Sequence, residues 1–189
     1  MLGHCMSMPR MARQHRAGGY TIIELMLTLA VLGVIASFAA PSFLNTIRIN
    51  RIVTDNNEFV TALTLARSEA IKRGGRVTLC RSSDQATCTG GGWETGWIVF
   101  TDPANFGAVD PGEEVLRTWE AASQGTTIRA DGGVTGWVSF VASGETRAAG
   151  ANIGTFRVCG SNADINQARE IRVGLIGYAA TSKGTAACP

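Results

Sequence analysis

The stretch Gly19-Tyr20-Thr21-Ile22-Ile23-Glu24-Leu25 decides how the chain is organised. It places an acidic residue, Glu24, at the entrance to an apolar run. No charged residue occurs from Leu25 to Ile47, a run of 23 residues. As a helix, such a run is long enough to cross about 30 Å of hydrocarbon. An ionisable group in lipid is costly and usually has a function, so Glu24 is the first candidate functional residue.

Basic residues flank the apolar run on both sides. Arg10, Arg13 and Arg16 precede it with no acid among the first 19 residues, and Arg48 and Arg51 follow it. An excess of positive residues marks the cytoplasmic side of a membrane span. The sequence therefore predicts a single-pass protein of the inner membrane, with a cytoplasmic N-terminus and a periplasmic body.

Two simpler interpretations of the run stand beside this one. An ordinary secretory signal would be cut at the small residues of Ser37-Phe38-Ala39. Glu24 is out of place in such a signal, and Pro41 would hinder the cleavage. A plain membrane anchor explains the length of the run but leaves the acid unexplained.

The junction residues resemble the cleavage and methylation motif of type IV pilins and type II secretion pseudopilins. The resemblance implies that residues 1–19 are a leader, which a prepilin peptidase removes between Gly19 and Tyr20. Tyr20, which stands where the family usually has Phe, would then be N-methylated. Glu24 becomes the fifth mature residue, the family's position for the acid that pairs with the N-terminal amine of a neighbouring subunit. A carboxylate paired in this way is tolerable in an apolar filament core and sets the register of assembly.

Residues 20–47 would form the helix that first spans the membrane and later lies in the filament core. Gly33 and Pro41 stand where many pilins carry a helix-loosening glycine and a helix-kinking proline. Proline lacks the amide donor and weakens a helix. Pro41 is equally compatible with a simple kink that has no role in assembly.

Helical spacing continues past the apolar run as far as Gly74-Gly75, which predicts a helix end. Apolar residues recur at intervals of three and four in one stripe, so we expect one helix over about 21–73. The members of the stripe are Ile49, Ile52/Val53, Phe59/Val60, Leu63, Ala66 and Ala70/Ile71. The charged residues that mark a mostly solvated face are Arg48, Arg51, Asp55, Glu58, Arg67, Glu69, Lys72 and Arg73.

Beyond Gly75 the pattern changes to alternating β-formers separated by Gly, Asp and Pro clusters. The predicted strands are Arg76–Cys80, Trp97–Thr101, Glu114–Trp119, Thr126–Ala130, Trp137–Ala142, Thr155–Cys159 and Glu170–Ile176. The expected fold class is α+β, pilin-like: a long hydrophobic and amphipathic N-terminal helix packed on an antiparallel β-sheet head, residues 48–189.

Two segments beyond the junction narrow the resemblance to one group within this family. Residues 60–73 with 76–80, and the segment Gly92-Trp93-Glu94-Thr95-Gly96-Trp97, are similar to the FimT/GspH minor pseudopilins. This resemblance implies a non-catalytic subunit that helps initiate or cap a type IV pilus or a type II secretion pseudopilus. Its partners would be other major and minor pilins or pseudopilins. The resemblance does not separate the two machines.

Histidine content limits the chemistry of the mature chain. The only two histidines, His4 and His15, precede residue 20. Their loss with the leader excludes Ser-His-Asp and Cys-His catalysis and His-ligated metal sites. The acids of residues 102–114 lack EF-hand spacing. We therefore expect neither an enzyme nor a cofactor or metal.

Four of the five cysteines, Cys80, Cys88, Cys159 and Cys188, lie beyond the leader. They form no C-x-x-C pair, which favours two disulfides in an oxidising compartment over zinc. Turn-forming residues between Cys80 and Cys88 would bring these two together. A bond from Cys159 to the penultimate Cys188 would tie down the C-terminal tail. We therefore predict Cys80–Cys88 and Cys159–Cys188 over the crossed pairings.

An alternative function is a DNA receptor for natural transformation. Some FimT proteins bind DNA through a Gly-Arg-x-Arg motif near the C-terminus, but the matching place here reads Gly177-Tyr178-Ala179-Ala180. Without its first 19 residues the chain has 14 basic and 15 acidic residues, which opposes general nucleic-acid binding. The candidate phosphate-binding residues are Arg147, Arg157, Arg169, Arg172 and Lys183.

Overall fold

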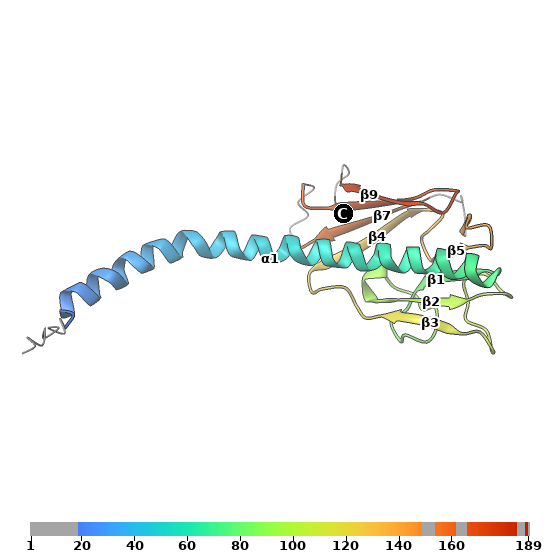
Figure 1. The fold of residues 1–189 in the computed structure, drawn as a ribbon, viewed down its shortest axis with the longest axis horizontal. Helices are drawn as coiled ribbons and strands as arrows, with labels where there is room; N and C mark the ends of the chain where they lie inside the picture. Colours follow the sequence, from blue (N-terminus) through green and yellow to red (C-terminus); the bar gives the residue numbers. More distant parts are fainter. Residues whose placement is uncertain (1–18, 149–153, 162–165, 185–187, 189) are drawn as a thin grey trace, which may run out of the picture. The chain divides into compact units, whose positions relative to one another are not determined.

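The computed structural model describes residues 19–148, 154–161, 166–184 and 188, and of Pro41 only the backbone. These residues fall into two compact units, the second of which begins at Leu44. One helix, α1 (Ile22–Arg73), has residues in both units (Figure 1). Its bounds agree with the helix predicted over about 21–73. Most of the predicted leader, residues 1–18, lies outside the described residues.

Both ends of α1 have clear capping residues. At the N-terminus the side-chain oxygen Oγ1 of Thr21 accepts a hydrogen bond from the backbone N–H of Glu24, at 3.3 Å. At the C-terminus Gly74 adopts a positive φ of 64°. The N–H of Gly74 bonds to the carbonyl of Ile71 and that of Gly75 to the carbonyl of Ala70. This pair of bonds is the Schellman motif, in which a glycine ends a helix without strain.

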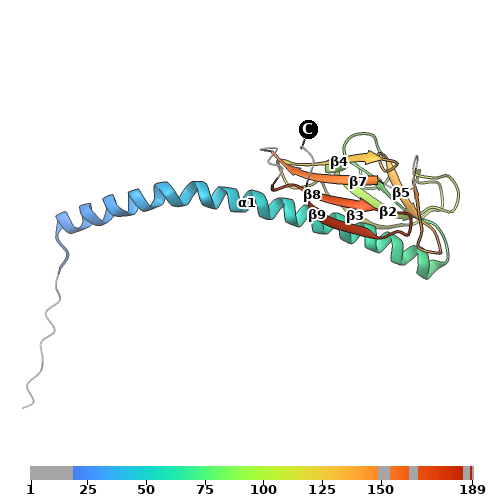
Figure 2. The same ribbon diagram turned by 90° about the horizontal axis from the view of Figure 1, so that it is seen from above.

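Every strand of the head pairs antiparallel with its neighbours, and the strands form two sheets (Figures 1 and 2). In spatial order, the five-stranded sheet contains β3 (Val115–Trp119), β2 (Trp97–Thr101), β1 (Val77–Arg81), β5 (Trp137–Phe140) and β6 (Thr146–Ala148). The four-stranded sheet contains β4 (Thr126–Gly132), β7 (Gly154–Gly160), β8 (Arg169–Val173) and β9 (Ala179–Lys183). A short 3-10 helix, η1 (Trp93–Thr95), precedes β2.

The fold class is the predicted α+β arrangement, with the difference that the strands divide between two sheets. All seven predicted strands are present, with ends that shift by as many as three residues. β6 and β9 were not predicted. β6 has only three residues, and β9, with the sequence Ala-Ala-Thr-Ser-Lys, is an exposed edge strand. Neither carries the β-branched or aromatic alternation by which a strand is recognised.

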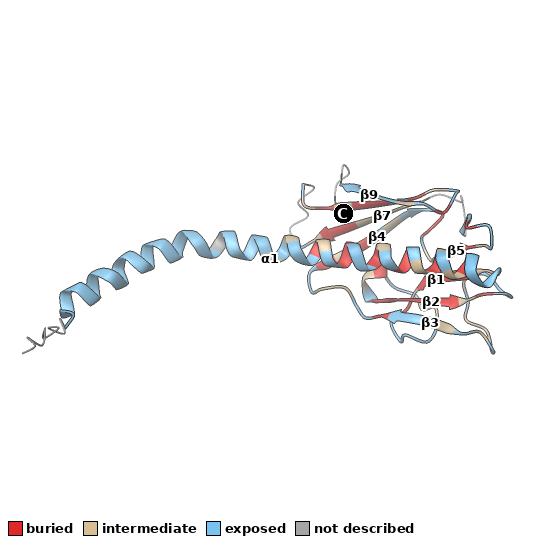
Figure 3. Ribbon diagram, in the orientation of Figure 1, coloured by how far each residue is buried: buried red, intermediate tan, exposed pale blue. Residues whose placement is uncertain are grey.

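The core of the head lies where α1 packs against both sheets. Phe59 of α1 is fully buried, and its ring lies 4.6–5.3 Å from those of Trp93, Trp97 and Phe156. Trp97 comes from the five-stranded sheet and Phe156 from the four-stranded one. Figure 3 shows the buried stripe that α1 presents along this part of its length. One aromatic side chain of the helix therefore joins the two sheets into one core.

Candidate functional site in the N-terminal stem and the head

The Gly19–Tyr20 junction directly precedes α1. The side chain of Tyr20 is 87% exposed, and no other atom lies within 4 Å of a Cβ placed on Gly19. Only Thr21 separates Tyr20 from the first helical residue. The two residues expected to form the processing site are thus accessible and lie outside the helix.

Glu24 lies in the first turn of α1 and is exposed. With Thr21 at the N-cap, Glu24 stands at the third helical position of the capping-box pattern. A negative side chain there is also favoured by the positive end of the helix dipole. Helix initiation is therefore a local role for Glu24 that sequence reasoning missed, although the Thr-x-x-Glu spacing signals it.

The apolar side chains of residues 20–43, which we call the stem, have almost no cover within their own unit. Ile22 is 82% exposed, Leu32 59% and Phe38 76%. Mean hydropathy reaches 2.3 over an 18-residue window of α1. By length and composition alone, this part of the helix could cross a membrane.

Two of the stem's hydroxyl groups donate hydrogen bonds within the helix. Thr28 donates to the carbonyl of Leu25 at 2.9 Å, and Ser37 donates to that of Val34 at 2.7 Å. Hydroxyls satisfied in this way can enter an apolar environment at little cost. The helix is continuous through Gly33 and Pro41. Gly33 has open space around its Cα, so close packing within the chain is not the reason for a glycine there.

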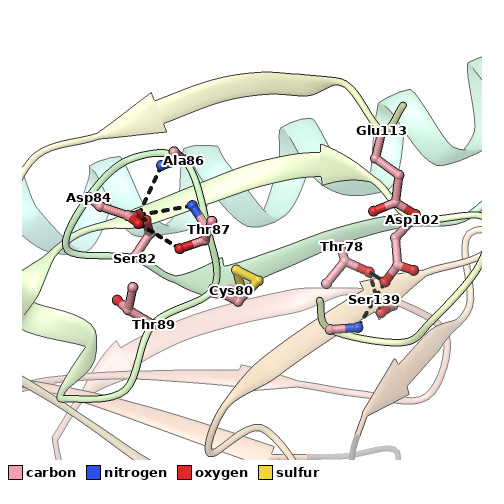
Figure 4. The surroundings of a disulfide bond; sticks show 12 residues. Thr78, Cys80, Ser82, Asp84, Ala86, Thr87, Thr89, Asp102, Glu113 and Ser139 are labelled. Atoms are coloured by element: carbon pink, nitrogen blue, oxygen red, sulfur yellow. Dashed lines mark hydrogen bonds between the residues drawn. A yellow bond between two sulfur atoms is a disulfide. The ribbon is translucent and has the colours of Figure 1, made fainter. Parts of the chain in front are cut away.

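Two disulfides join the cysteines in the pairing expected from the sequence. Cys80–Cys88 spans Cα atoms 5.6 Å apart, and Cys159–Cys188 spans Cα atoms 5.9 Å apart. The first closes the loop after β1, shown in Figure 4. The second attaches Cys188 to the end of β7, where both cysteines are buried with Ala168. The first bond therefore holds a loop against a strand, and the second holds Cys188 against a strand.

The loop between Cys80 and Cys88 is organised by the carboxylate of Asp84 (Figure 4). Its oxygens accept hydrogen bonds from the Thr87 hydroxyl at 2.5 Å, the backbone N–H groups of Thr87 and Ala86, and the Ser82 hydroxyl. These bonds, that from the Thr87 hydroxyl above all, hold the pKa of Asp84 well below its usual range. The ionised form of Asp84 thus stabilises the folded loop.

Asp102, one of the acids of residues 102–114, binds groups inside the protein. Its carboxylate is fully buried and accepts hydrogen bonds from Arg76 at 2.8 Å, Thr78 at 2.5 Å and the N–H of Gly107 at 3.0 Å. Thr78 also shares a hydrogen bond with Ser139 (Figure 4). Within the described residues no group of three or more His, Cys, Asp or Glu side chains could hold a metal ion.

Charged residues at the end of α1 bind the helix to the connection between β2 and β3. Arg73 bonds to Glu69 at 2.8 Å and to Glu114 at 2.7 Å. The hydrogen bond from Arg73 lowers the pKa of Glu69, and Lys72 adds to the effect. The same bond to Glu69 raises the pKa of Arg73. This network is exposed, and exposed ion pairs stabilise a fold only slightly.

The structure does not gather the five candidate phosphate-binding residues into one face. Arg147 lies on β6 of the five-stranded sheet, and the other four lie on the four-stranded sheet. There the strand register places Arg157 and Arg172 on one face and Arg169 and Lys183 on the other.

Several of these arginines already form ion pairs with acidic side chains or donate hydrogen bonds to backbone carbonyls. Arg157 forms an ion pair with Asp131, and Arg172 pairs with Glu170 at 3.0 Å. Arg169 donates to the carbonyl oxygens of Gln167 and Ala168. These contacts reduce the positive charge that is free to meet a phosphate backbone.

One acid of α1 was misassigned to the solvated face. Asp55 is only 3% exposed, and its Oδ1 atom accepts hydrogen bonds from the N–H and hydroxyl of Ser123. It lies three residues after Ile52 and four before Phe59, both buried. This spacing places Asp55 on the apolar stripe and could have identified it as a buried carboxylate.

Comparisons with known proteins agree with this arrangement. The chain is 33% identical over 115 residues to the pilin-like protein PilA1 of Thermus thermophilus, and the match covers 60% of this chain and 66% of that protein. The match thus spans just under two thirds of that relative's length.

Solved structures of similar fold include the type IV minor pilin FimU of Pseudomonas aeruginosa. One crystal form has a TM-score of 0.56 at 16% identity and covers 74% of this chain and 93% of FimU. A second crystal form has a TM-score of 0.52 at 17% identity and covers 71% and 95%, respectively. At these identities the likeness concerns the fold alone.

Two family models match the sequence. The prokaryotic N-terminal methylation motif matches residues 14–40, which include the Gly19–Tyr20 junction, Glu24 and most of the stem. The model of the type II transport protein GspH matches residues 55–177, well over half of the chain and most of the head. The chain therefore belongs to the GspH family of pilin-like proteins.

Proposed function

We propose that the chain is a non-catalytic minor subunit that helps to initiate or cap a type IV pilus or a type II secretion pseudopilus. In this proposal a prepilin peptidase cuts between Gly19 and Tyr20, and Tyr20 is then N-methylated. The observation that carries the proposal is the stem: an apolar helix with almost no cover in its own unit, most of which lies within the match to the methylation motif. Such a surface needs lipid or other subunits to bury it.

The same stem serves two stages. Before assembly it anchors the subunit in the inner membrane, with the head in the periplasm. During assembly it leaves the lipid and packs among the stems of neighbouring subunits. Exchanging lipid for apolar neighbours changes hydrophobic burial little, so specific polar contacts must decide when and where a subunit enters.

Glu24 supplies such a contact. Within its own chain it is exposed, and the acidic side chain is free to meet the N-terminal amine of the next subunit. An unpaired carboxylate in an apolar core is expensive, whereas a carboxylate paired with an ammonium group is tolerated. The pairing therefore selects the register at which two stems fit together.

Replacing Glu24 separates anchoring from assembly. We expect Glu24→Ala to leave the chain in the inner membrane fraction but to reduce its copurification with other pilin subunits by about thirtyfold or more, as for a buried ion pair that loses one partner. Glu145→Ala, which removes an exposed acid of the head whose ion-pair partner Arg147 is also exposed, is the matched control and should assemble normally. Normal incorporation of Glu24→Ala would refute the proposed role of this residue.

A further inference from the structure

An open groove runs between α1 and β3, the edge strand of the five-stranded sheet. Two adjoining hollows of about 390 Å³ and 350 Å³ form it, and both are lined by Thr54, Glu58 and Trp119. The larger hollow also has Asp55 and Glu120 on its wall. We call the two hollows together the α1–β3 groove. It lies within the head and has no part in the local roles described above for Glu24, the disulfides or Asp102.

Asp55 gives the groove an unsatisfied acceptor. Its Oδ1 atom accepts hydrogen bonds from the N–H of Ser123 at 3.1 Å and from its hydroxyl at 2.9 Å. The other oxygen, Oδ2, is buried and has no hydrogen-bond partner in the part of the chain that the structure describes. A buried carboxylate oxygen without a donor is costly. A cationic donor entering the groove would remove that cost.

The surrounding charges favour a cation. Glu58 and Glu120 add two exposed carboxylates to that of Asp55. Arg117 is the one basic residue on the described walls, and its guanidinium lies over the Trp119 ring, 4.8 Å from the centroid. Arg51, one turn before Asp55 on α1, donates instead to the carbonyl of Gln124. The described walls of the groove therefore carry more negative than positive charge, which suits an ammonium or guanidinium group.

We infer that the α1–β3 groove receives a lysine or arginine side chain of a neighbouring pilin-type subunit, which pairs with Asp55 and Glu58. A metal ion is a poorer occupant because the described acids do not form a ligand set. A long basic side chain can place its charge at Asp55 while its methylene groups contact Trp119. The inference rests on the proposed function, since it requires that the chain assemble with other subunits.

A photo-crosslinker placed at the exposed position Thr54 tests the inference in the full chain, in its native envelope. With p-benzoyl-phenylalanine at this position, we expect a crosslink to a pilin-type subunit, mapped by mass spectrometry to within a few residues of a lysine or arginine. Adding Asp55→Asn should reduce the yield about thirtyfold or more, as expected when one partner of a buried charge pair is lost. The asparagine retains the oxygen that accepts from Ser123, so the fold should persist.

Glu113→Gln is the matched control. Like Asp55, Glu113 has one carboxylate oxygen that accepts a hydrogen bond, from the N–H of Asp110, and one buried oxygen without a partner among the described residues. Unlike Asp55, Glu113 does not line the groove. Its variant should crosslink at the unsubstituted yield. Equal yields for Asp55→Asn and Glu113→Gln would overturn the inference, as would a crosslink with no basic residue near it, or no crosslink from a chain that still copurifies with pilins. If the unsubstituted chain fails to copurify with pilins, the proposed function itself is wrong.

Discussion

The stem and the head of this protein differ in whether they bury their large apolar side chains. Phe38 of the stem is 76% exposed, whereas Phe59, further along the same helix, is fully buried against aromatic rings from both sheets. The head buries most of its large apolar residues within its own chain and adds two disulfides. The stem does neither.

Because of this difference, substitutions in the head and in the stem should affect different properties of the protein. A side chain that is buried within the head contributes to the free energy of unfolding of the isolated protein. A side chain of the stem contributes only once lipid or another subunit covers it. Changes in the head should therefore alter stability, and changes in the stem should alter anchoring and assembly.

The largest expected effect comes from truncating one phenylalanine in each region. Phe59→Ala removes the ring shared by Trp93, Trp97 and Phe156 and should lower the free energy of unfolding by about 4 kcal/mol. Phe38→Ala should leave it unchanged within error. Chemical denaturation of the purified mature chain in detergent measures both. Equal destabilisation by the two variants would contradict the division between stem and head.

The second effect concerns the tail of the head. Replacing both Cys159 and Cys188 with serine opens a loop with a sequence separation of 29 residues. The chain-entropy model assigns such a loop about 3.6 kcal/mol of stability. We expect a loss of this size in denaturant unfolding and faster proteolysis after residue 160. Anchoring of the stem should not change, and a double variant lost from the membrane fraction would show that the two regions depend on each other.

Sequence reasoning reached the stem and the disulfides because their signals are local. A charge-free run, an acid near its start and turn-formers between two cysteines can each be read along the chain. The division into two sheets depends on which strand pairs with which, and β4 pairs with β7, more than 20 residues further on. The Arg76–Asp102 ion pair was missed for the same reason, since its two residues are distant in sequence. The burial of Asp55 was missed although its place on the apolar stripe signals it.

A smaller effect should appear at low pH in the loop that Asp84 organises. Because the folded protein holds the pKa of Asp84 below its usual range, the stabilisation is present above the unfolded value of about 3.9 and is lost as the pH falls through the folded value. Asp84→Asn should be slightly less stable than the unsubstituted chain at pH 7. The difference should narrow as the pH falls below about 4. Thermal unfolding from pH 7 to pH 2.5 tests this, and a constant difference would contradict it.

The central claim is that the stem is retained as an assembly element rather than removed as a secretory signal. Mass spectrometry of the intact chain, purified from membranes of cells that contain the assembly machinery, tests it directly. If the stem is retained, the N-terminus is Tyr20 carrying one methyl group, with Glu24 four residues further on. An N-terminus at Ala40, which follows the small residues of a secretory cleavage site, would remove most of the stem and contradict the account.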